Sequence, residues 1–234
     1  MKGVVLAGGK GTRLRPMTKV MNKHVLPVYD EPMIFYPVRT LIENGISEIL
    51  VISTPEHIGG YIQLLEDEFD ADFSYKVQES PEGIAHAVHL AEDFVDDRFA
   101  VVLGDNIVID DLSDSIERFE AGDSDCMIFL KEVSDPSRYG VAEIDGDVVV
   151  DIKEKPSEPE TNDAVIGLYL YTDEVFDRIP DLTKSDRGEL EITDLNKSYL
   201  DDGRLTYSKL DGEWFDVGTH DGLLKASRFV ADDT

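Results

Sequence analysis

The sequence predicts an α/β fold: a Rossmann-like mixed sheet, mostly parallel, with helices on its flanks. Strand-like and helix-like segments alternate through the first half of the chain, which implies parallel βαβ units. Two apolar segments, 48–53 (EILVIS) and 99–103 (FAVVL), have the composition of fully buried strands. Segment 57–69 is amphipathic, because Ile58, Ile62, Leu65 and Phe69 are spaced for one helical face.

In the first half, each predicted element follows from a local signal. The apolar segment 2–7 stops at Gly8 and Gly9, as a strand does when it enters a turn, and Gly45 follows a helical pattern that it would close. We expect strands at 2–7, 48–53, 73–77 and 99–103, and helices at 33–44, 57–69 and 84–94. Ligands of open parallel sheets bind beyond the carboxyl ends of the strands, so we expect binding residues within 8–23, 78–83 and 104–106.

The second half of the chain changes character and predicts a mixed sheet. Asp145 and Gly146 form a hairpin turn signal between two strand-like segments. We expect strands at 126–131, 140–144, 148–154, 164–171, 204–208 and 213–215, and helices at 190–201 and 223–231. There is no internal repeat or long linker, so residues 1–234 should form a single domain with two lobes, 1–120 and 121–234.

The charge of the chain limits its partners. Its 234 residues carry a formal net charge of −28 at pH 7, and the acidic residues are spread along the whole length. Nucleic acid is excluded as a partner, because such a surface repels phosphates. Diffuse charge favours adaptation to a high-salt (halophilic) cytoplasm over a single acidic functional face. Full activity and stability in low-salt buffer would count against that hypothesis.

Cysteine content and hydropathy indicate the compartment. The single cysteine, Cys126, excludes an internal disulfide framework and should be a small core residue, so a reducing cytoplasm is the expected location. No segment approaches the ~18 uninterrupted apolar residues of a membrane-spanning helix, and no signal-peptide cleavage pattern follows the first strand. We therefore expect no membrane partner.

The glycine-rich segment after the first strand, LAGGKGTRLRP, predicts a phosphate site. Glycines allow backbone amides to approach an anion closely. The segment matches neither the dinucleotide fingerprint, whose last glycine is replaced by Leu14, nor the P-loop pattern. Instead, Lys10, Arg13 and Arg15 alternate with the glycines. Arginine binds phosphate oxygens bidentately, so this segment predicts a local positive site for a polyanion.

The same segment resembles the nucleotide-binding loop of the sugar-1-phosphate nucleotidyltransferases. The continuation NKHVLPVYDEPMIFYPV resembles the glucose-1-phosphate thymidylyltransferases, and the similarity runs on through VQESPEGIAHA, VLGDN, RYGV, EKP, GLYLYT, RGELEITD and WFDVGTHD. The resemblance implies a fold of the nucleotide-diphospho-sugar transferase type, with lobe 1–120 mainly binding nucleotide and lobe 121–234 mainly binding sugar phosphate. It implies transfer of a nucleotidyl group from dTTP to glucose 1-phosphate by in-line attack, giving dTDP-glucose and pyrophosphate.

The resemblance also implies roles for single residues. Arg13 and Lys23 would act on the reacting phosphates, and Asp105 would bind catalytic Mg²⁺ together with Asp216. The implied nucleotide-binding residues are Leu6, Gly8, Gly9, Gly11, Thr12, Gln78 and Gly83. The implied sugar-phosphate residues are Asn106, Gly140, Glu154, Lys155 and Val165. Two carboxylates suit Mg²⁺, which completes its shell with phosphate oxygens and water.

Several alternatives remain open at this point. UTP differs from dTTP at one methyl and one hydroxyl, so a uridylyltransferase remains an alternative. A glycosyltransferase that consumes nucleotide-sugar is a second alternative, although the cationic glycine loop favours a triphosphate. Family members often have further C-terminal helices that form an allosteric nucleotide site, so the expectation is a short form without it. A homo-oligomer is compatible with the sequence. His86 and His89 are expected to pack on a helix rather than bind a metal.

Overall fold

The computed structural model describes the backbone of residues 1–233 and the side chains of residues 1–232. The chain forms two compact units, each built from separate parts of the sequence. The N-terminal unit contains residues 2–81, residues 102–110 and the segment from Gly212 onward. The central unit contains Met1, residues 82–101 and residues 111–211. Both halves of the chain contribute to each unit, so the division of substrate binding between lobes 1–120 and 121–234 stays a prediction.

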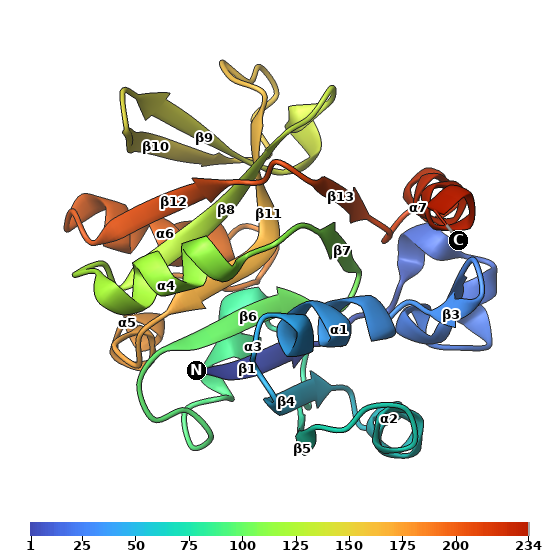
Figure 1. The fold of residues 1–234 in the computed structure, drawn as a ribbon. Coiled ribbons are helices and arrows are strands. Elements are labelled where there is room, and N and C mark those ends of the chain that lie inside the picture. The colour runs from blue at the N-terminus through green and yellow to red at the C-terminus, as the bar shows by residue number, and fades with distance from the viewer. Residues whose placement is uncertain (234) are drawn as a thin grey trace. The chain divides into compact units, whose positions relative to one another are not determined.

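The N-terminal unit contains the parallel part of the fold. Strands β1, β4 and β5 lie side by side, with Val4 opposite Leu50 and Leu50 opposite Ser74 (Figure 1). Helix α1 packs on β1, β3 and β7, whereas α2 packs on β5. The strands of this unit are β1 (Lys2–Leu6), β2 (Pro27–Val28), β3 (Glu31–Pro32), β4 (Glu48–Ser53), β5 (Asp72–Val77), β7 (Asn106–Ile109) and β13 (Glu213–Asp216); its α-helices are α1 (Phe35–Glu43), α2 (Ile58–Glu66) and α7 (His220–Asp233).

The short pair of β7 and β13 joins two distant parts of the sequence. The two strands are antiparallel, with Trp214 opposite Val108 and Asp216 opposite Asn106. Beside them, a buried apolar cluster ties the loop after β1 to β7 and α7; its members are Leu14, Leu26, Val28, Met33, Tyr36, Ile107, Val217 and Ala226. Burial of such side chains stabilises by roughly 1.5–3 kcal/mol each, so this cluster holds the segments around Asp216 in place.

The central unit is a mixed sheet with helices on it. Strand β9 pairs with β10 and β11, β8 pairs with β11, and all of these pairs are antiparallel, whereas β12 runs parallel to β8. Helix α6 packs on β8, β10 and β12. The elements of this unit are α3 (Ile84–His89), most of β6 (Phe99–Leu103), α4 (Ser113–Ala121), β8 (Cys126–Glu132), β9 (Gly140–Asp145), β10 (Val148–Glu154), β11 (Asp163–Tyr171), α5 (Val175–Arg178), α6 (Ile192–Asp201) and β12 (Leu205–Lys209).

The predicted α/β class, with a mixed sheet flanked by helices, is confirmed. Cys126 is fully buried on β8, as expected for a core residue. The prediction was wrong about helix ends: α3 stops at His89 instead of residue 94, and α7 begins at His220 instead of residue 223. The early start of α7 has a physical cause, because the Thr219 hydroxyl accepts the Gly222 N–H and caps the helix. Strand β7 and helices α4 and α5 were missed by the sequence analysis.

Candidate active site

The glycine-rich segment follows β1 as an exposed turn in the N-terminal unit. Gly9 and Gly11 have φ values of +98° and +56°, which other residues adopt only with strain. The Thr18 hydroxyl donates to the Gly11 carbonyl at 2.6 Å and holds the turn. Residue Thr12 starts a short 3-10 turn. The sequence therefore uses glycine where the backbone must curl, and Gly9, Lys10 and Thr12 of this turn are exposed.

Gln78 lies next to the start of this turn. It follows β5, and its backbone N–H donates to Ser53, the last residue of the neighbouring strand β4. A Cβ placed on Gly8 would lie 3.2 Å from Gln78 Oε1. The carboxyl ends of β1 and β5 thus bring Gly8 and the largely buried Gln78 together, as the strand-end argument predicts. Leu6 is buried at the end of β1, and its carbonyl accepts the Gly104 N–H.

Lys23 and Asp105 form a close ion pair beside the turn. Lys23 Nζ donates to Asp105 Oδ2 at 2.5 Å, and the two side chains are only 15% and 10% exposed. Burial by itself would raise the pKa of Asp105, but the charges of Lys23 and Arg13 and the Lys23 hydrogen bond hold that pKa well below its usual value. Asp105 is therefore a carboxylate at neutral pH, with Lys23 as its counter-charge.

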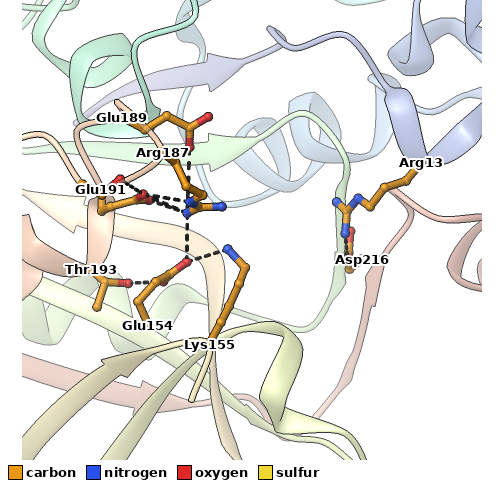
Figure 2. A network of polar contacts seen from close by, with 9 residues as sticks. Arg13, Glu154, Lys155, Arg187, Glu189, Glu191, Thr193 and Asp216 are labelled. Carbon is orange, nitrogen blue, oxygen red and sulfur yellow. Dashed lines mark hydrogen bonds and ion pairs between the residues drawn. The ribbon is translucent and has the colours of Figure 1, made fainter. Parts of the chain in front are cut away.

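Asp216 lies beside Asp105 because β13 pairs with β7. The backbone N–H of Val217 donates to the Asp105 carbonyl at 2.9 Å, and the Gly218 N–H donates to Asp216 Oδ1 at 3.0 Å. Arg13 Nη1 is 3.6 Å from Asp216 Oδ2 (Figure 2). These contacts bring together three predicted charged residues, Arg13, Asp105 and Asp216, that are far apart in the sequence.

The space between the two carboxylates is bounded by Gly218. A Cβ placed on Gly218 would lie 2.8 Å from Asp105 Oδ2, 3.0 Å from Asp216 Oδ1 and 2.7 Å from Arg13 Nη2. Two carboxylate oxygens therefore approach one point, one from the turn between β6 and β7 and one from β13. Within the described residues, no group of three or more His, Cys, Asp or Glu side chains could hold a metal ion. Any ion here would have two protein carboxylates at most.

Asn106 is a buried neighbour of this pair. Trp214 Nε1 donates to Asn106 Oδ1 at 2.7 Å, and the Asn106 amide donates to Asp105 Oδ1 at 3.4 Å. These contacts orient Asn106 toward the carboxylates of its own unit. The predicted role of Asn106 in sugar-phosphate binding stays a prediction.

His24 supports the Lys23 segment from inside. The ring is fully buried, and burial is the main cause that lowers its pKa well below the usual value, so it is neutral. Asn22 Oδ1 accepts the His24 backbone N–H at 2.7 Å and lies 2.9 Å from His24 Nδ1, so Nδ1 carries the proton. A Cβ on Gly104 would lie 3.0 Å from His24 Nε2. The ring thus packs closely against Gly104, next to Asp105 in the sequence.

In the central unit, Gly83 makes a close backbone approach. Its φ is +111°, and an added Cβ would lie 2.3 Å from the Leu190 carbonyl oxygen. The Leu190 N–H donates to Glu82, and the Ala85 N–H donates to Leu190. No residue larger than glycine fits here, so the loop before α3 is held against the segment before α6.

The predicted sugar-phosphate residues of the central unit lie on three adjacent strands. Gly140 on β9 is opposite Glu154 on β10 and Val165 on β11. A Cβ on Gly140 would lie 3.2 Å from Thr193 Oγ1 and 3.7 Å from both Glu154 Oε2 and Val165 Cβ, so glycine avoids a tight contact with the Thr193 hydroxyl. Lys155, which follows β10, has a φ of +43° and donates its N–H to Tyr139. The sheet register thus brings together Gly140, Glu154, Lys155 and Val165.

Both oxygens of Glu154 have donors (Figure 2). Lys155 Nζ donates to Oε1 at 2.5 Å, Arg187 Nη2 is 3.4 Å from Oε1, and the Thr193 hydroxyl donates to Oε2 at 2.6 Å. Burial alone would raise the pKa of Glu154, but these hydrogen bonds and charges hold it below its usual value. Glu154 is therefore an oriented carboxylate whose charge is neutralised by its neighbours.

Sequence reasoning missed four contributors to these sites. Thr193 and Arg187 lie in the segment RGELEITD, and Gly218 and Trp214 lie in WFDVGTHD. Both segments were recognised as resembling the family, but no role was assigned to these four residues. Arg187 also pairs with Glu191 at 2.8 Å, which orients its guanidinium (Figure 2). The motif context was the available signal; the contacts themselves depend on the fold.

Comparisons with known proteins agree with the geometry. A family model described as nucleotidyl transferase matches residues 2–233. A glucose-1-phosphate thymidylyltransferase of Xanthomonas campestris is 46% identical over 236 residues, which cover 98% of this chain and 80% of that protein. A low-salt glycan biosynthesis nucleotidyltransferase of Haloferax volcanii is 43% identical and covers 100% of this chain and 67% of its own length.

A solved structure has the same fold. A Bacillus anthracis protein, assigned as a glucose-1-phosphate thymidylyltransferase and solved in complex with a sucrose, matches with a TM-score of 0.94 and 46% identity. The match covers 99% of this chain and 96% of that chain. Within residues 1–233, none of the helices has the length and apolar composition needed to cross a membrane.

Proposed function

The chain belongs to the nucleotidyl transferase family, and we propose that it transfers a thymidylyl group from dTTP to glucose 1-phosphate, giving dTDP-glucose and pyrophosphate. The observation that carries this proposal is the cluster of Arg13, Lys23, Asp105 and Asp216 beside a glycine-rich turn. Paired cations and paired carboxylates at an exposed backbone turn suit a triphosphate and its counter-ion. The names of the relatives support the choice of substrates.

The nucleotide would bind to the N-terminal unit. Backbone N–H groups of the turn that contains Gly8, Gly9, Gly11 and Thr12 would contact the phosphates. Gln78, beside Gly8, offers one donor and one acceptor, which is what a thymine or uracil edge requires. Gly83 belongs to the central unit, and its part in nucleotide binding stays a prediction.

The residues present fit a Mg²⁺ ion. Asp105 Oδ2 and Asp216 Oδ1 both lie within 3.0 Å of the point that a Gly218 Cβ would occupy, so the missing side chain leaves a cradle between two hard oxygen ligands. Mg²⁺ is typically held in this way, by one or two carboxylates plus substrate phosphates and water. When bound, the ion would neutralise charge on the phosphates. Asp105 and Asp216 would hold it.

The sugar phosphate would bind to the central unit. Glu154 has a fixed orientation and could accept hydrogen bonds from sugar hydroxyls through lone pairs that its protein donors leave. Lys155 and Arg187, both in contact with Glu154, would supply positive charge for the phosphate. Gly140 and Val165 would line the same place, because the sheet register sets them beside Glu154.

The reaction needs charge stabilisation rather than a general base. The phosphate of the sugar is an anionic nucleophile that attacks the α-phosphorus in line with the leaving pyrophosphate. Lys23 would contact the reacting phosphates and Arg13 would hold the pyrophosphate, so positioning and electrostatics supply most of the acceleration. The absence of a nucleophile–histidine pair from the predicted site agrees with this chemistry.

A nucleotide panel tests the proposal. The protein is incubated with Mg²⁺, glucose 1-phosphate and dTTP, UTP, CTP, ATP or GTP, and pyrophosphate release is followed. We expect the highest kcat/KM with dTTP and the next with UTP, because one methyl in an apolar pocket is worth only about 1–3 kcal/mol. No release with any pyrimidine triphosphate would overturn the proposed function. Preference for UTP would replace thymidylyl by uridylyl transfer.

A further inference from the structure

Gly218 bounds the space in which two carboxylates meet, and no motif or comparison assigns it a role. We propose that Gly218 is the residue that keeps this space open for the divalent ion, so that the absence of its side chain sets the metal affinity of the site. The inference rests on the proposed function, because it concerns the ion of that reaction. It adds a positioning residue that contributes neither a ligand nor a charge.

The geometry singles out the Cβ position of this residue. A Cβ there would lie 2.8 Å from Asp105 Oδ2 and 3.0 Å from Asp216 Oδ1. Oxygen ligands approach Mg²⁺ at about 2.0–2.1 Å and Ca²⁺ at 2.3–2.6 Å, so a methyl group at this point occupies space that an ion bridging both oxygens requires. A methyl group at residue 218 and the proposed ion would therefore occupy the same space.

The two carboxylates have little freedom to avoid a methyl group. Asp105 Oδ2 is held by Lys23 Nζ at 2.5 Å, and Asp216 Oδ1 is held by the Gly218 N–H at 3.0 Å. Both side chains are only 10% exposed. The third close atom, Arg13 Nη2, belongs to a side chain that is 58% exposed and can turn away. Arg13 can therefore move away from an added methyl group, whereas the Asp105 carboxylate must leave its present position to avoid it.

A purely structural reason for glycine does not account for this position. The φ of Gly218 lies outside the left-handed region, and the three nearest atoms to its added Cβ all belong to side chains. Gly222 is the contrast: its Cβ would lie 1.9 Å from the Asp216 carbonyl oxygen, so the backbone itself demands glycine there. At Gly218 the demand comes from Asp105, Asp216 and Arg13.

The test is Gly218→Ala, which keeps the N–H that binds Asp216 and adds only the methyl group. Mn²⁺ affinity is measured by electron paramagnetic resonance in the presence of dTTP, because nucleotide phosphates complete the shell of the ion. We expect the affinity to fall about 10- to 100-fold, and the half-saturating Mg²⁺ concentration in the pyrophosphate assay to rise by a similar factor. The matched control is Gly59→Ala, on the exposed face of α2 with nothing within 4 Å, which should leave both values unchanged.

A second background separates the ion from Arg13. In the double variant with Arg13→Gln and Gly218→Ala, the added methyl group no longer contacts a guanidinium. A loss of Mn²⁺ affinity that acts through Arg13 alone should therefore be absent from this double variant. We expect the loss of Mn²⁺ affinity to persist there. The same double variant makes the measurement if Gly218→Ala by itself does not fold, as judged by circular dichroism and Tm.

The possible outcomes are distinguishable. Wild-type Mn²⁺ affinity in Gly218→Ala, or a loss that vanishes in the Arg13→Gln background, overturns the inference and leaves the proposed function standing. Absence of pyrophosphate release by the wild-type protein overturns the proposed function instead, and the Mn²⁺ measurement needs no turnover. A selective loss of Mn²⁺ affinity in both backgrounds supports the inference.

Discussion

The two units of the molecule each hold carboxylates next to cations, but they arrange them differently. In the N-terminal unit, Asp105 and Asp216 come from separate strand ends, and their oxygens approach one small space beside Gly218. In the central unit, both oxygens of Glu154 have donors, and one of these donors, Arg187, also pairs with Glu191. Two converging carboxylates repel each other unless a cation lies near, whereas Glu154 already has two cations, Lys155 and Arg187, in contact with it.

This difference in arrangement indicates which class of ligand each unit can bind. The two carboxylates of the N-terminal unit need nearby positive charge, which Lys23 and Arg13 supply at 2.5 and 3.6 Å. Phosphates and a divalent ion can take over these contacts. In the central unit, Glu154 is an oriented, neutralised acceptor that suits neutral hydroxyl groups, and Lys155 and Arg187 beside it suit the phosphate of the sugar. The predictions below test that division, and the largest expected effect comes first.

Loss of charge at Asp105 should have the largest effect. Asp105→Asn keeps the shape of the side chain but removes one of two carboxylates and the partner of Lys23. We expect kcat for pyrophosphate release to fall about 10²- to 10³-fold, a loss typical of removing one preorganised electrostatic contact. The control is Asp123→Asn, an exposed carboxylate in the loop before β8. Wild-type kcat in Asp105→Asn would remove Asp105 from the site.

Loss of the Thr193 hydroxyl should have a smaller effect, confined to the central unit. Thr193→Val preserves volume but removes the 2.6 Å hydrogen bond to Glu154 Oε2. We expect the free energy of unfolding to fall by about 1.5–3 kcal/mol in urea titrations, the usual value of a hydrogen bond to a charged group. The KM for glucose 1-phosphate should rise while the KM for dTTP stays constant. A rise in the dTTP KM alone would contradict the division between the units.

Acid should remove the stability that the Glu154 contacts supply. Because the pKa of Glu154 is lowered in the folded state, its carboxylate stabilises the fold above the unfolded pKa of about 4.3, and this contribution is lost as pH falls through the folded pKa. The difference in unfolding free energy between wild type and Glu154→Gln should therefore shrink between about pH 5 and pH 3. Urea titrations at several pH values measure it. A difference that stays constant would show that Glu154 is not held by its cations.

Local patterns in the sequence predicted much of the fold but not its long-range pairings. Strands 48–53 and 99–103 are correct to the residue, because continuous apolar segments between polar turns have few alternatives. Strand β7 was missed because its four residues, NIVI, form a strand only by pairing with β13, more than a hundred residues later. The start of α7 was readable, since Thr219 precedes it as a capping residue, but the predicted helix began at residue 223.

The candidate site divides in the same way. Motif resemblance pointed to Asp105 and Asp216, and the β7–β13 register explains how they meet. Nothing local in the sequence separates these two from the other acidic residues of a chain with 50 of them. Gly218 and Thr193 could not be selected from the sequence, because their importance lies in what their side-chain positions face in the folded chain.

The most direct test of the account is the pair of Michaelis constants in two variants. Gln78→Met removes the amide beside Gly8 in the N-terminal unit, and Glu154→Gln removes the oriented carboxylate of the central unit. We predict that Gln78→Met raises the KM for dTTP by about tenfold, the value of one lost hydrogen bond, and that Glu154→Gln raises the KM for glucose 1-phosphate by a similar factor. In each variant the other KM should stay at its wild-type value. The opposite assignment, with Glu154→Gln raising only the KM for dTTP, would contradict the account.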